Sequence, residues 1–218
     1  MHYEILKTGS KGNCIIVEDK FMLDCGVPYK VVEPYLKDIK LIFISHIHGD
    51  HLNKTTVEKI AYNYPNIKFV CGVEVNDSIV NYGVVQKNVY GLFCDIWYCL
   101  GMCNVKVNYL YHDVPNYALS LFYKNKTLFY ATDTSKIDHI VAKDYDTYLI
   151  EANYYTNDEL DEKILEAQEK GEFTYLNRVK QTHLSQLDAI NWLDKNKGEN
   201  SHFMFIHEHI SKEVDNND

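Results

Sequence analysis

The sequence predicts an α/β protein that folds as a four-layer αββα sandwich. Strand-like apolar runs fall into two groups along the 218 residues, and helical patterns follow strands in each group. This order indicates two sheets packed against each other with helices on the outside. The length suits one domain with a full core, so we expect residues 1–211 to form a single domain and residues 212–218, "KEVDNND", to form a polar C-terminal tail.

The first group of predicted strands ends near residue 71. "CIIVEDKFMLDCG" (14–26) has the pattern of a strand, a tight turn at Asp19-Lys20 and a second strand. "LIFIS" (41–45) is apolar almost throughout, as expected for a strand buried on both faces. "NKTTVEKIAYNY" (53–64) has helical spacing, and "IKFVC" (67–71) is the next predicted strand.

The second group begins after a stretch of weak pattern that starts near residue 89. Strands are predicted at "VKVNYLY" (105–111), "ALSLFY" (118–123), "TLFYAT" (127–132), "YDTYLIEAN" (145–153) and "HFMFIH" (202–207), with a hairpin turn at "KNK" (124–126). Helices are predicted at "NDELDEKILEAQEK" (157–170), capped by Asn157 or Asp158, and at "SQLDAINWLDKN" (185–196), capped by Ser185.

The composition is that of an ordinary globular chain, with 46% hydrophobic and 24% charged residues. No run is long and apolar enough to span a membrane, and "MHYEILKTGS" lacks the apolar core of a signal peptide. We therefore expect a cytoplasmic protein without membrane contact. In that compartment the six cysteines are expected to remain reduced thiols.

The charge balance constrains the substrate. A net charge of −9 argues against a broad basic surface for a nucleic-acid polymer. It does not exclude a small phosphate ester, because bound divalent cations add positive charge locally. Arg178 is the only arginine, and therefore the one candidate for bidentate phosphate recognition by that side chain; a solvated surface arginine is the competing interpretation.

"ISHIHGDH" (44–51) crowds three histidines and an aspartate directly after an apolar run. His46 and His48 are two positions apart, so in extended backbone they point to the same side. Three more ligand-type residues fall at or just past the ends of later predicted strands: His112, Asp133 and His209. Strand ends that converge on one edge bring these side chains into one cleft. Imidazole and carboxylate at this density suit two divalent ions, Zn²⁺ first, with Mn²⁺ and Fe²⁺ as alternatives.

We assign the predicted ligands to the two ions as follows. The first ion is held by three histidines: His46, His48 and His112. The second is held by Asp50, His51 and His209, and Asp133 bridges the two. A hydroxide shared by both ions is a strong nucleophile at neutral pH, and the paired cations stabilise charge on an attacked phosphoryl or acyl group.

The motif "SHIHGDH" resembles the HxHxDH motif of the metallo-β-lactamase fold superfamily, and the resemblance continues in order along nearly the whole chain. "TGSKGNCIIVE" and "MLDCG" are similar to the first turn and to a strand-ending aspartate of that family. "YHDVPNYALSLFY" and "FYATDT" resemble its third and fourth motifs. "LIEANY", "THLSQLDA" and "HEHIS" resemble segments of its phosphodiesterase branch, which includes tRNase Z, YycJ/WalJ-type proteins and phage anti-Pycsar cyclic-nucleotide phosphodiesterases.

The resemblance implies the catalytic residues His183, Glu151 and Asp50. His183 would protonate the leaving oxygen and Glu151 would orient it; the competing interpretation is that His183 merely precedes the following helix. Asp24 either accepts an N–H from a ligand histidine or caps the turn before Gly26. His207 and His209 can each be the last ligand, and His209 is favoured because "HIS" matches the family's His-Leu-Ser.

These inferences predict a dinuclear metal-dependent phosphodiester hydrolase that acts on a cyclic mononucleotide or a short oligonucleotide by attack of a metal-bridging hydroxide. A DNA or RNA nuclease of the YycJ or tRNase Z type is the first alternative. A glyoxalase-like thioester hydrolase is the second, and it would not depend on Glu151 and His183. Because dimers are common in this branch, we expect a homodimer.

Overall fold

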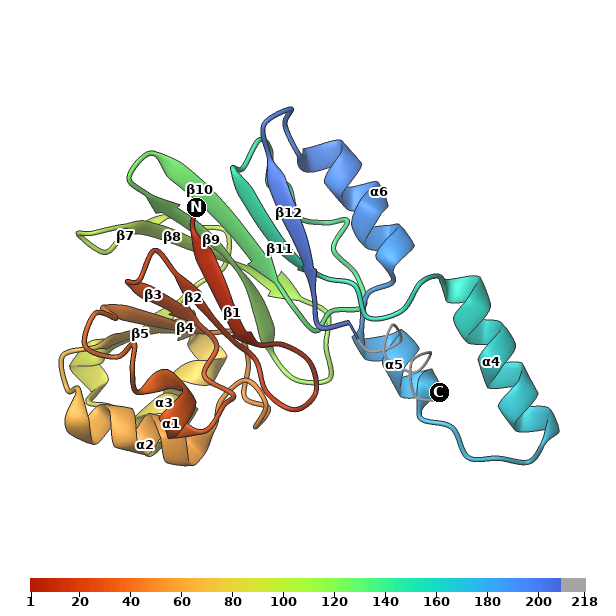
Figure 1. Cartoon of the computed structure of the whole chain (residues 1–218), viewed down its shortest axis with the longest axis horizontal. Coiled ribbons are helices and arrows are strands. Elements are labelled where there is room, and N and C mark those ends of the chain that lie inside the picture. Colours follow the sequence, from red (N-terminus) through yellow and green to blue (C-terminus); the bar gives the residue numbers. More distant parts are fainter. Residues whose placement is uncertain (209–218) are drawn as a thin grey trace.

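The computed structural model describes residues 1–208, which fold into two six-stranded sheets packed face to face (Figure 1). The first sheet contains, in spatial order, β1 (Tyr3–Lys7), β2 (Cys14–Val17), β3 (Phe21–Leu23), β4 (Leu41–Ile44), β5 (Lys68–Gly72) and β6 (Val89–Leu92). The second sheet contains, in spatial order, β12 (His202–Ile206), β11 (Thr147–Glu151), β10 (Lys126–Ala131), β9 (Asn116–Tyr123), β8 (Asn104–Leu110) and β7 (Tyr98–Cys99).

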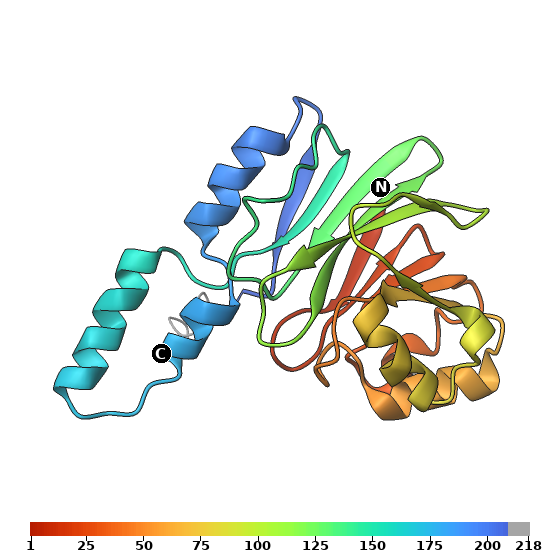
Figure 2. The same ribbon diagram turned by 180° about the vertical axis from the view of Figure 1, so that it is seen from behind.

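Residues 1–208 also contain six α-helices: α1 (Tyr29–Val32), α2 (Lys54–Asn63), α3 (Asn76–Asn81), α4 (Asn157–Glu169), α5 (Leu176–Thr182) and α6 (Gln186–Asn196). Two short 3₁₀ turns, η1 (Val73–Val75) and η2 (Gln86–Asn88), flank α3. Helices α1 to α3 lie outside the first sheet and α6 lies outside the second, as the view from behind also shows (Figure 2). The predicted αββα sandwich is confirmed.

Most predicted strands occur where the apolar patterns place them. β4 pairs in parallel with both β3 and β5, and all four of its residues are buried, which explains why "LIFI" carries no polar face. The "KNK" turn joins β9 to β10, with Lys124 and Asn125 both in the left-handed region at φ 48° and 61°. The six cysteines are free thiols, as predicted.

Several local features differ from the prediction, and α1, α3, β6 and β7 were not predicted from the sequence. β1 carries no clear sequence signal because it is an edge strand whose residues are only partly covered. The N-cap of α4 is Thr156 and not Asn157 or Asp158: Thr156 has extended backbone, and its side chain accepts the N–H of Glu159. α5 is a short, mostly polar helix that the periodicity does not reveal.

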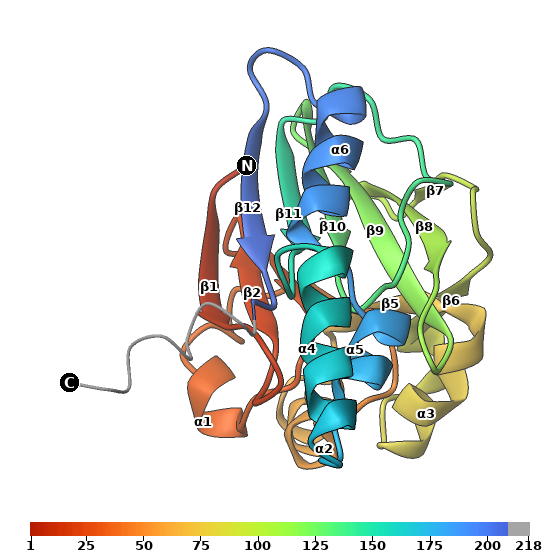
Figure 3. The same cartoon turned by 90° about the vertical axis from the view of Figure 1, so that its right-hand side faces the viewer.

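Helices α4 and α5 form what we call the α4–α5 arm, residues 156–182, in which α4 stands away from the sandwich and α5 lies between α4 and the edge of the sandwich (Figures 1 and 3). The arm packs around a small apolar cluster of its own, in which Leu160 and Ile164 of α4 and Tyr154 contact Leu176 and Val179 of α5. This cluster is separate from the main core between the sheets. No helix in residues 1–208 has the length and apolar character needed to cross a membrane.

Candidate metal centre

The loop that follows β4 is held from both sides by backbone hydrogen bonds. The N–H of Asn13 donates to the carbonyl of Asp50 (2.7 Å), and the N–H of Cys25 donates to the carbonyl of His51 (2.8 Å). Gly26 lies so close to the Asp50 carbonyl that a Cβ atom there would overlap it. Helix α2 begins directly after the loop, with Asn53 as its N-cap. The segment "HIHGDH" is therefore fixed in one conformation at the end of a buried strand.

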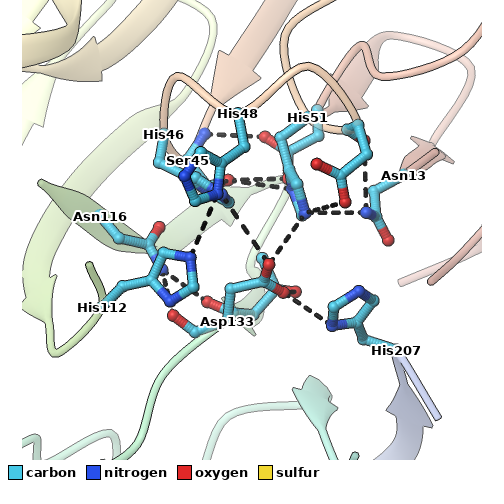
Figure 4. A network of polar contacts seen from close by, with 12 residues as sticks. Asn13, Ser45, His46, His48, His51, His112, Asn116, Asp133 and His207 are labelled. Carbon is cyan, nitrogen blue, oxygen red and sulfur yellow. Dashed lines mark hydrogen bonds and ion pairs between the residues drawn. The ribbon is translucent and has the colours of Figure 1, made fainter. Parts of the chain in front are cut away.

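His46, His48 and His112 form the first group of donor atoms (Figure 4). Nδ1 of His48 lies 3.2 Å from Nε2 of His46 and 3.3 Å from Nε2 of His112. Nδ1 of His112 donates to the carbonyl of Thr182 (3.1 Å), so Nε2 of the neutral ring carries a lone pair. Burial lowers the pKa of His46 well below its ordinary value and also lowers that of His112, which keeps both rings neutral at pH 7.

Asp50, His51, Asp133 and His207 form the second group. Nε2 of His51 lies 3.2 Å from Oδ2 of Asp133 and 3.5 Å from Oδ2 of Asp50. The same Oδ2 of Asp133 lies 3.8 Å from Nε2 of His46 in the first group, and its Oδ1 lies 2.8 Å from Nδ1 of His207. Asp133 belongs to the second group and is the member of it that also reaches toward the first group, as Figure 4 shows.

Each group draws donors from both sheets. The donors from the first sheet all follow β4: His46, His48, Asp50 and His51. The donors from the second sheet follow β8, β10 and β12 respectively: His112, Asp133 and His207. The centre thus lies at the edge where strand ends of both sheets meet.

Asp24, at the end of β3, fixes the orientation of His51 from behind. The carboxylate is fully buried, and its Oδ2 lies 2.7 Å from Nδ1 of His51. Oδ2 also accepts the hydroxyls of Tyr130 (2.6 Å) and Ser45 (2.9 Å), and Oδ1 accepts the N–H of Ser45 (2.7 Å). Nδ1 of His51 donates to this carboxylate, so Nε2 is the ring nitrogen that faces the second group.

The two groups have the geometry and the charge of a metal centre. Nitrogens bound at tetrahedral zinc lie about 3.3–3.4 Å apart, given Zn–N bonds of about 2.0–2.1 Å. The nitrogens of the first group are separated by 3.2 and 3.3 Å. In the second group, Asp133 and Asp24 hold the pKa of His51 well above its ordinary value although burial opposes this. This group is therefore a negative pocket that favours a cation.

The surroundings of His207, on the other side of the second group, also favour a cation. Although burial lowers the pKa of this histidine, Asp133 and Glu151 raise it to about 10. Its Nε2 is buried and has no hydrogen-bond partner among residues 1–208. The residues present fit divalent metal ions.

Glu151 and His183 form a pair beside the second group. Nδ1 of His183 lies 2.5 Å from Oε1 of Glu151, whose Oε2 accepts the N–H of Thr134 (2.8 Å). Burial alone would lower the pKa of His183, but the Glu151 carboxylate outweighs it and raises that pKa. Burial would likewise raise the pKa of Glu151, but His183 and His207 hold it below its ordinary value. The pair therefore favours the ionised carboxylate and the charged imidazole.

These groups open into a cleft of about 310 Å³. Its walls combine residues of the two donor groups with His183, with Tyr175 at the N-cap of α5 and with side chains of α5, including Arg178. A larger hollow of about 1170 Å³ lies between α4, α6 and residues 135–143, and none of the predicted site residues lines it. The smaller cleft is therefore the place where the predicted residues can act on a bound molecule.

The structure brings most of the predicted site residues together. Six predicted ligands lie in the two groups: His46, His48, Asp50, His51, His112 and Asp133. Glu151 and His183 form the expected contact. His209 lies outside the described residues, and His207, the alternative, is the histidine that contacts Asp133.

Two residues near the centre were not anticipated from the sequence. Nδ2 of Asn13 lies 2.8 Å from Nε2 of His51, and Oδ1 of Asp113 lies 3.2 Å from Nε2 of His112. The dipeptide "HD" after a strand is a weak signal for Asp113. Asn13 stands in "GSKGNC", where the glycines indicate a turn but not what the turn contacts.

Comparison with known proteins agrees with this architecture. A family model described as "Beta-lactamase superfamily domain" matches residues 22–207. A search of curated proteins finds none that matches. Among solved structures, human tRNase Z, short form, has a TM-score of 0.70 at 17% identity, with 96% of this chain and 93% of that chain covered.

Two further structures are similar at comparable length. The metallo-beta-lactamase fold protein YhfI from Bacillus subtilis has a TM-score of 0.68 at 14% identity, covering 95% of this chain and 86% of that one. A diphosphatase from the PhnP family has a TM-score of 0.62 at 13% identity, covering 95% and 85%. At these identities the likeness is one of fold.

Proposed function

This chain belongs to the β-lactamase superfamily, and we propose that it is a metal-dependent phosphodiesterase that hydrolyses a cyclic mononucleotide or a short oligonucleotide. The fold is that of metal-dependent hydrolases. Two of the structural neighbours, a tRNase Z and a diphosphatase, carry the names of enzymes that cleave phosphate bonds. The observation that carries the proposal is the Glu151–His183 pair in the same cleft as the two donor groups.

Two metal ions would be held by the two donor groups. We assign His46, His48 and His112 to the first ion. We assign Asp50, His51 and His207 to the second, with Asp133 shared. His207 takes the place expected for His209 because its ring contacts Asp133. When bound, the ions would supply positive charge for the phosphoryl oxygens and lower the pKa of a coordinated water.

The chain's own residues supply the proton that a phosphodiester leaving group needs. An alkoxide is a poor leaving group until it is protonated. The Glu151 carboxylate holds Nδ1 of His183 and favours the charged ring, so Nε2 of His183 is the nitrogen that can deliver a proton. Thr134 in turn fixes Glu151 through its N–H. Hydrolysis of a lactam or a thioester does not require this pair.

The test compares substrates that differ in their need for a proton. Zinc- or manganese-loaded protein and its His183→Asn variant are given a 3′,5′-cyclic nucleotide, a 5′-phosphorylated oligonucleotide and bis(p-nitrophenyl) phosphate. We expect the variant to lose roughly 10²–10⁴-fold in turnover of the nucleotide substrates. It should lose little with the nitrophenyl ester, because p-nitrophenolate leaves without protonation.

Several controls and outcomes decide the proposal. Metal content is measured in both proteins, and metal-stripped protein should turn over none of the substrates. An equal loss on all substrates would remove His183 from the role of proton donor. Wild-type protein that cleaves a thioester and no phosphodiester would replace the proposal with the glyoxalase-like alternative.

A further inference from the structure

The chain's single arginine lies at the mouth of the catalytic cleft. Arg178 is on α5, and among the residues that line the cleft it is the only lysine or arginine. Val179 and Thr182 of the same helix and Tyr175 at its N-cap also line the cleft. The arginine side chain is 70% exposed, so a bound molecule can reach its guanidinium group.

Asp113 links this guanidinium group to the first group of donor atoms. Nη2 of Arg178 donates to Oδ2 of Asp113 (2.8 Å). The other oxygen, Oδ1, lies 3.2 Å from Nε2 of His112 and 3.3 Å from Nε2 of His48. A single carboxylate therefore spans the distance from the arginine to the histidines that we assign to the first ion.

An anion thus already occupies the space between Arg178 and the candidate metal centre, and that anion is part of the chain. A guanidinium group offers several donors in a planar fork and pairs with phosphate as well as with carboxylate. A phosphate group is similar in reach to a carboxylate and presents more acceptor oxygens. The side chain of Asp113 is 35% exposed, so a phosphate group of a ligand can displace its carboxylate from the guanidinium group.

We propose that Arg178 forms a subsite for a phosphate group that flanks the scissile phosphodiester, and that Asp113 holds the guanidinium in place until that phosphate replaces it. The inference rests on the proposed function and narrows its substrate class. The scissile group belongs at the two donor groups, so a phosphate at Arg178 is a second one. A short oligonucleotide with a terminal phosphate satisfies both sites, whereas a cyclic mononucleotide satisfies only the first.

The test measures equilibrium binding of three dinucleotides to metal-loaded protein. Every protein in this experiment carries the substitution His183→Asn, which slows hydrolysis of the ligand. The ligands are dithymidine with no terminal phosphate, with a 5′-phosphate and with a 3′-phosphate. We expect one phosphorylated form to bind about 10–100-fold more tightly than the unphosphorylated one, the usual range for charge-assisted hydrogen bonds. The form that is preferred identifies which end of the substrate reaches Arg178.

Three substitutions distinguish specific binding of the phosphate at Arg178 from a general attraction of the phosphate to positive charge on the protein. Arg178→Gln should reduce the preference, which is the ratio of the Kd of the unphosphorylated dinucleotide to that of the phosphorylated one, to about one. Asp113→Asn should increase the preference, because the competing carboxylate is gone. Lys180→Gln is the matched control: it removes a positive charge from the same helix, but Lys180 pairs with Asp161 and does not line the cleft. It should leave the preference unchanged.

The outcomes distinguish the subsite from the proposed function. A preference that survives Arg178→Gln, or that falls in Asp113→Asn with metal content intact, would overturn the subsite. Absence of any binding would overturn it too. Hydrolysis by the wild-type protein is measured separately, so Arg178-dependent binding without phosphodiester hydrolysis would refute the proposed function and retain the subsite.

Discussion

Asp24→Asn changes the buried group that orients His51 while leaving its shape and backbone almost unaltered. Asp24 has φ 56°, in the left-handed region that asparagine also tolerates. Its carboxylate accepts four hydrogen bonds, one from the Tyr130 hydroxyl, one from Nδ1 of His51 and two from Ser45. An asparagine offers only one oxygen to these donors, and its NH₂ group donates.

The two possible orientations of the new amide have different costs. With its NH₂ at the position of Oδ1, it faces the N–H of Ser45, and that buried donor loses its acceptor at about 1–3 kcal/mol. With its NH₂ at the position of Oδ2, it donates to Nδ1 of His51 and moves the ring proton to Nε2. That nitrogen then has no lone pair for a metal ion. Loss of such an orienting partner typically costs about 10–100-fold in metal affinity.

A competition titration with a chromophoric chelator measures the affinity of each ion, and urea unfolding of metal-free protein measures the stability. We expect only the second ion, to which His51 is assigned, to lose affinity. Asp24 contacts His51 and none of the three histidines of the first group. Tyr130→Phe is the matched control, since it removes one donor to the same carboxylate and should leave metal affinity unchanged. Full affinity for both ions in Asp24→Asn would refute the reasoning, and so would an equal loss at both.

Three further predictions concern the same centre. Gly26→Ala should lower the thermal midpoint and the metal affinity, because the new Cβ overlaps the Asp50 carbonyl; Gly49→Ala in the same loop, where nothing lies within 4 Å, should change neither by much. His207→Ala should bind one ion fewer by elemental analysis, whereas His209→Ala should keep the full complement; the reverse result would make His209 the ligand. Stripping the metal by dialysis against a chelator should lower the thermal midpoint by roughly 5–10 °C if the ion is present at about 100 times its Kd, and an unchanged midpoint would contradict metal binding to the folded state.

The parts of the fold and site that are encoded locally could be predicted from the sequence. The run "LIFI" is apolar because β4 is buried on both faces, and the ligands that follow it are contiguous in "HIHGDH". The resemblance to a known family supplied the pairing of Glu151 with His183, which no local pattern encodes. The choice between His207 and His209 could not be made from periodicity, since both follow the same predicted strand in the sequence and differ by two positions.

Other contacts arise only when distant elements are assembled. The hydroxyl of Tyr130 reaches Asp24 across the interface between the sheets, 106 positions along the chain. Arg178 meets Asp113 because the short helix α5 folds back over the cleft. α5 has only seven residues and little apolar periodicity, so the sequence did not reveal that it carries a wall of the site.

The origin of the donors in two different sheets has a mechanical consequence. Each ion would tie the end of β4 to a strand end more than 60 positions away in the chain, in the manner of a reversible cross-link that closes a long loop. Release of an ion then requires the two halves of the sandwich to part at that edge. Metal exchange should accordingly be slow and should follow the rate of local opening of the sheet interface, and the metal-free chain should begin to unfold along that seam.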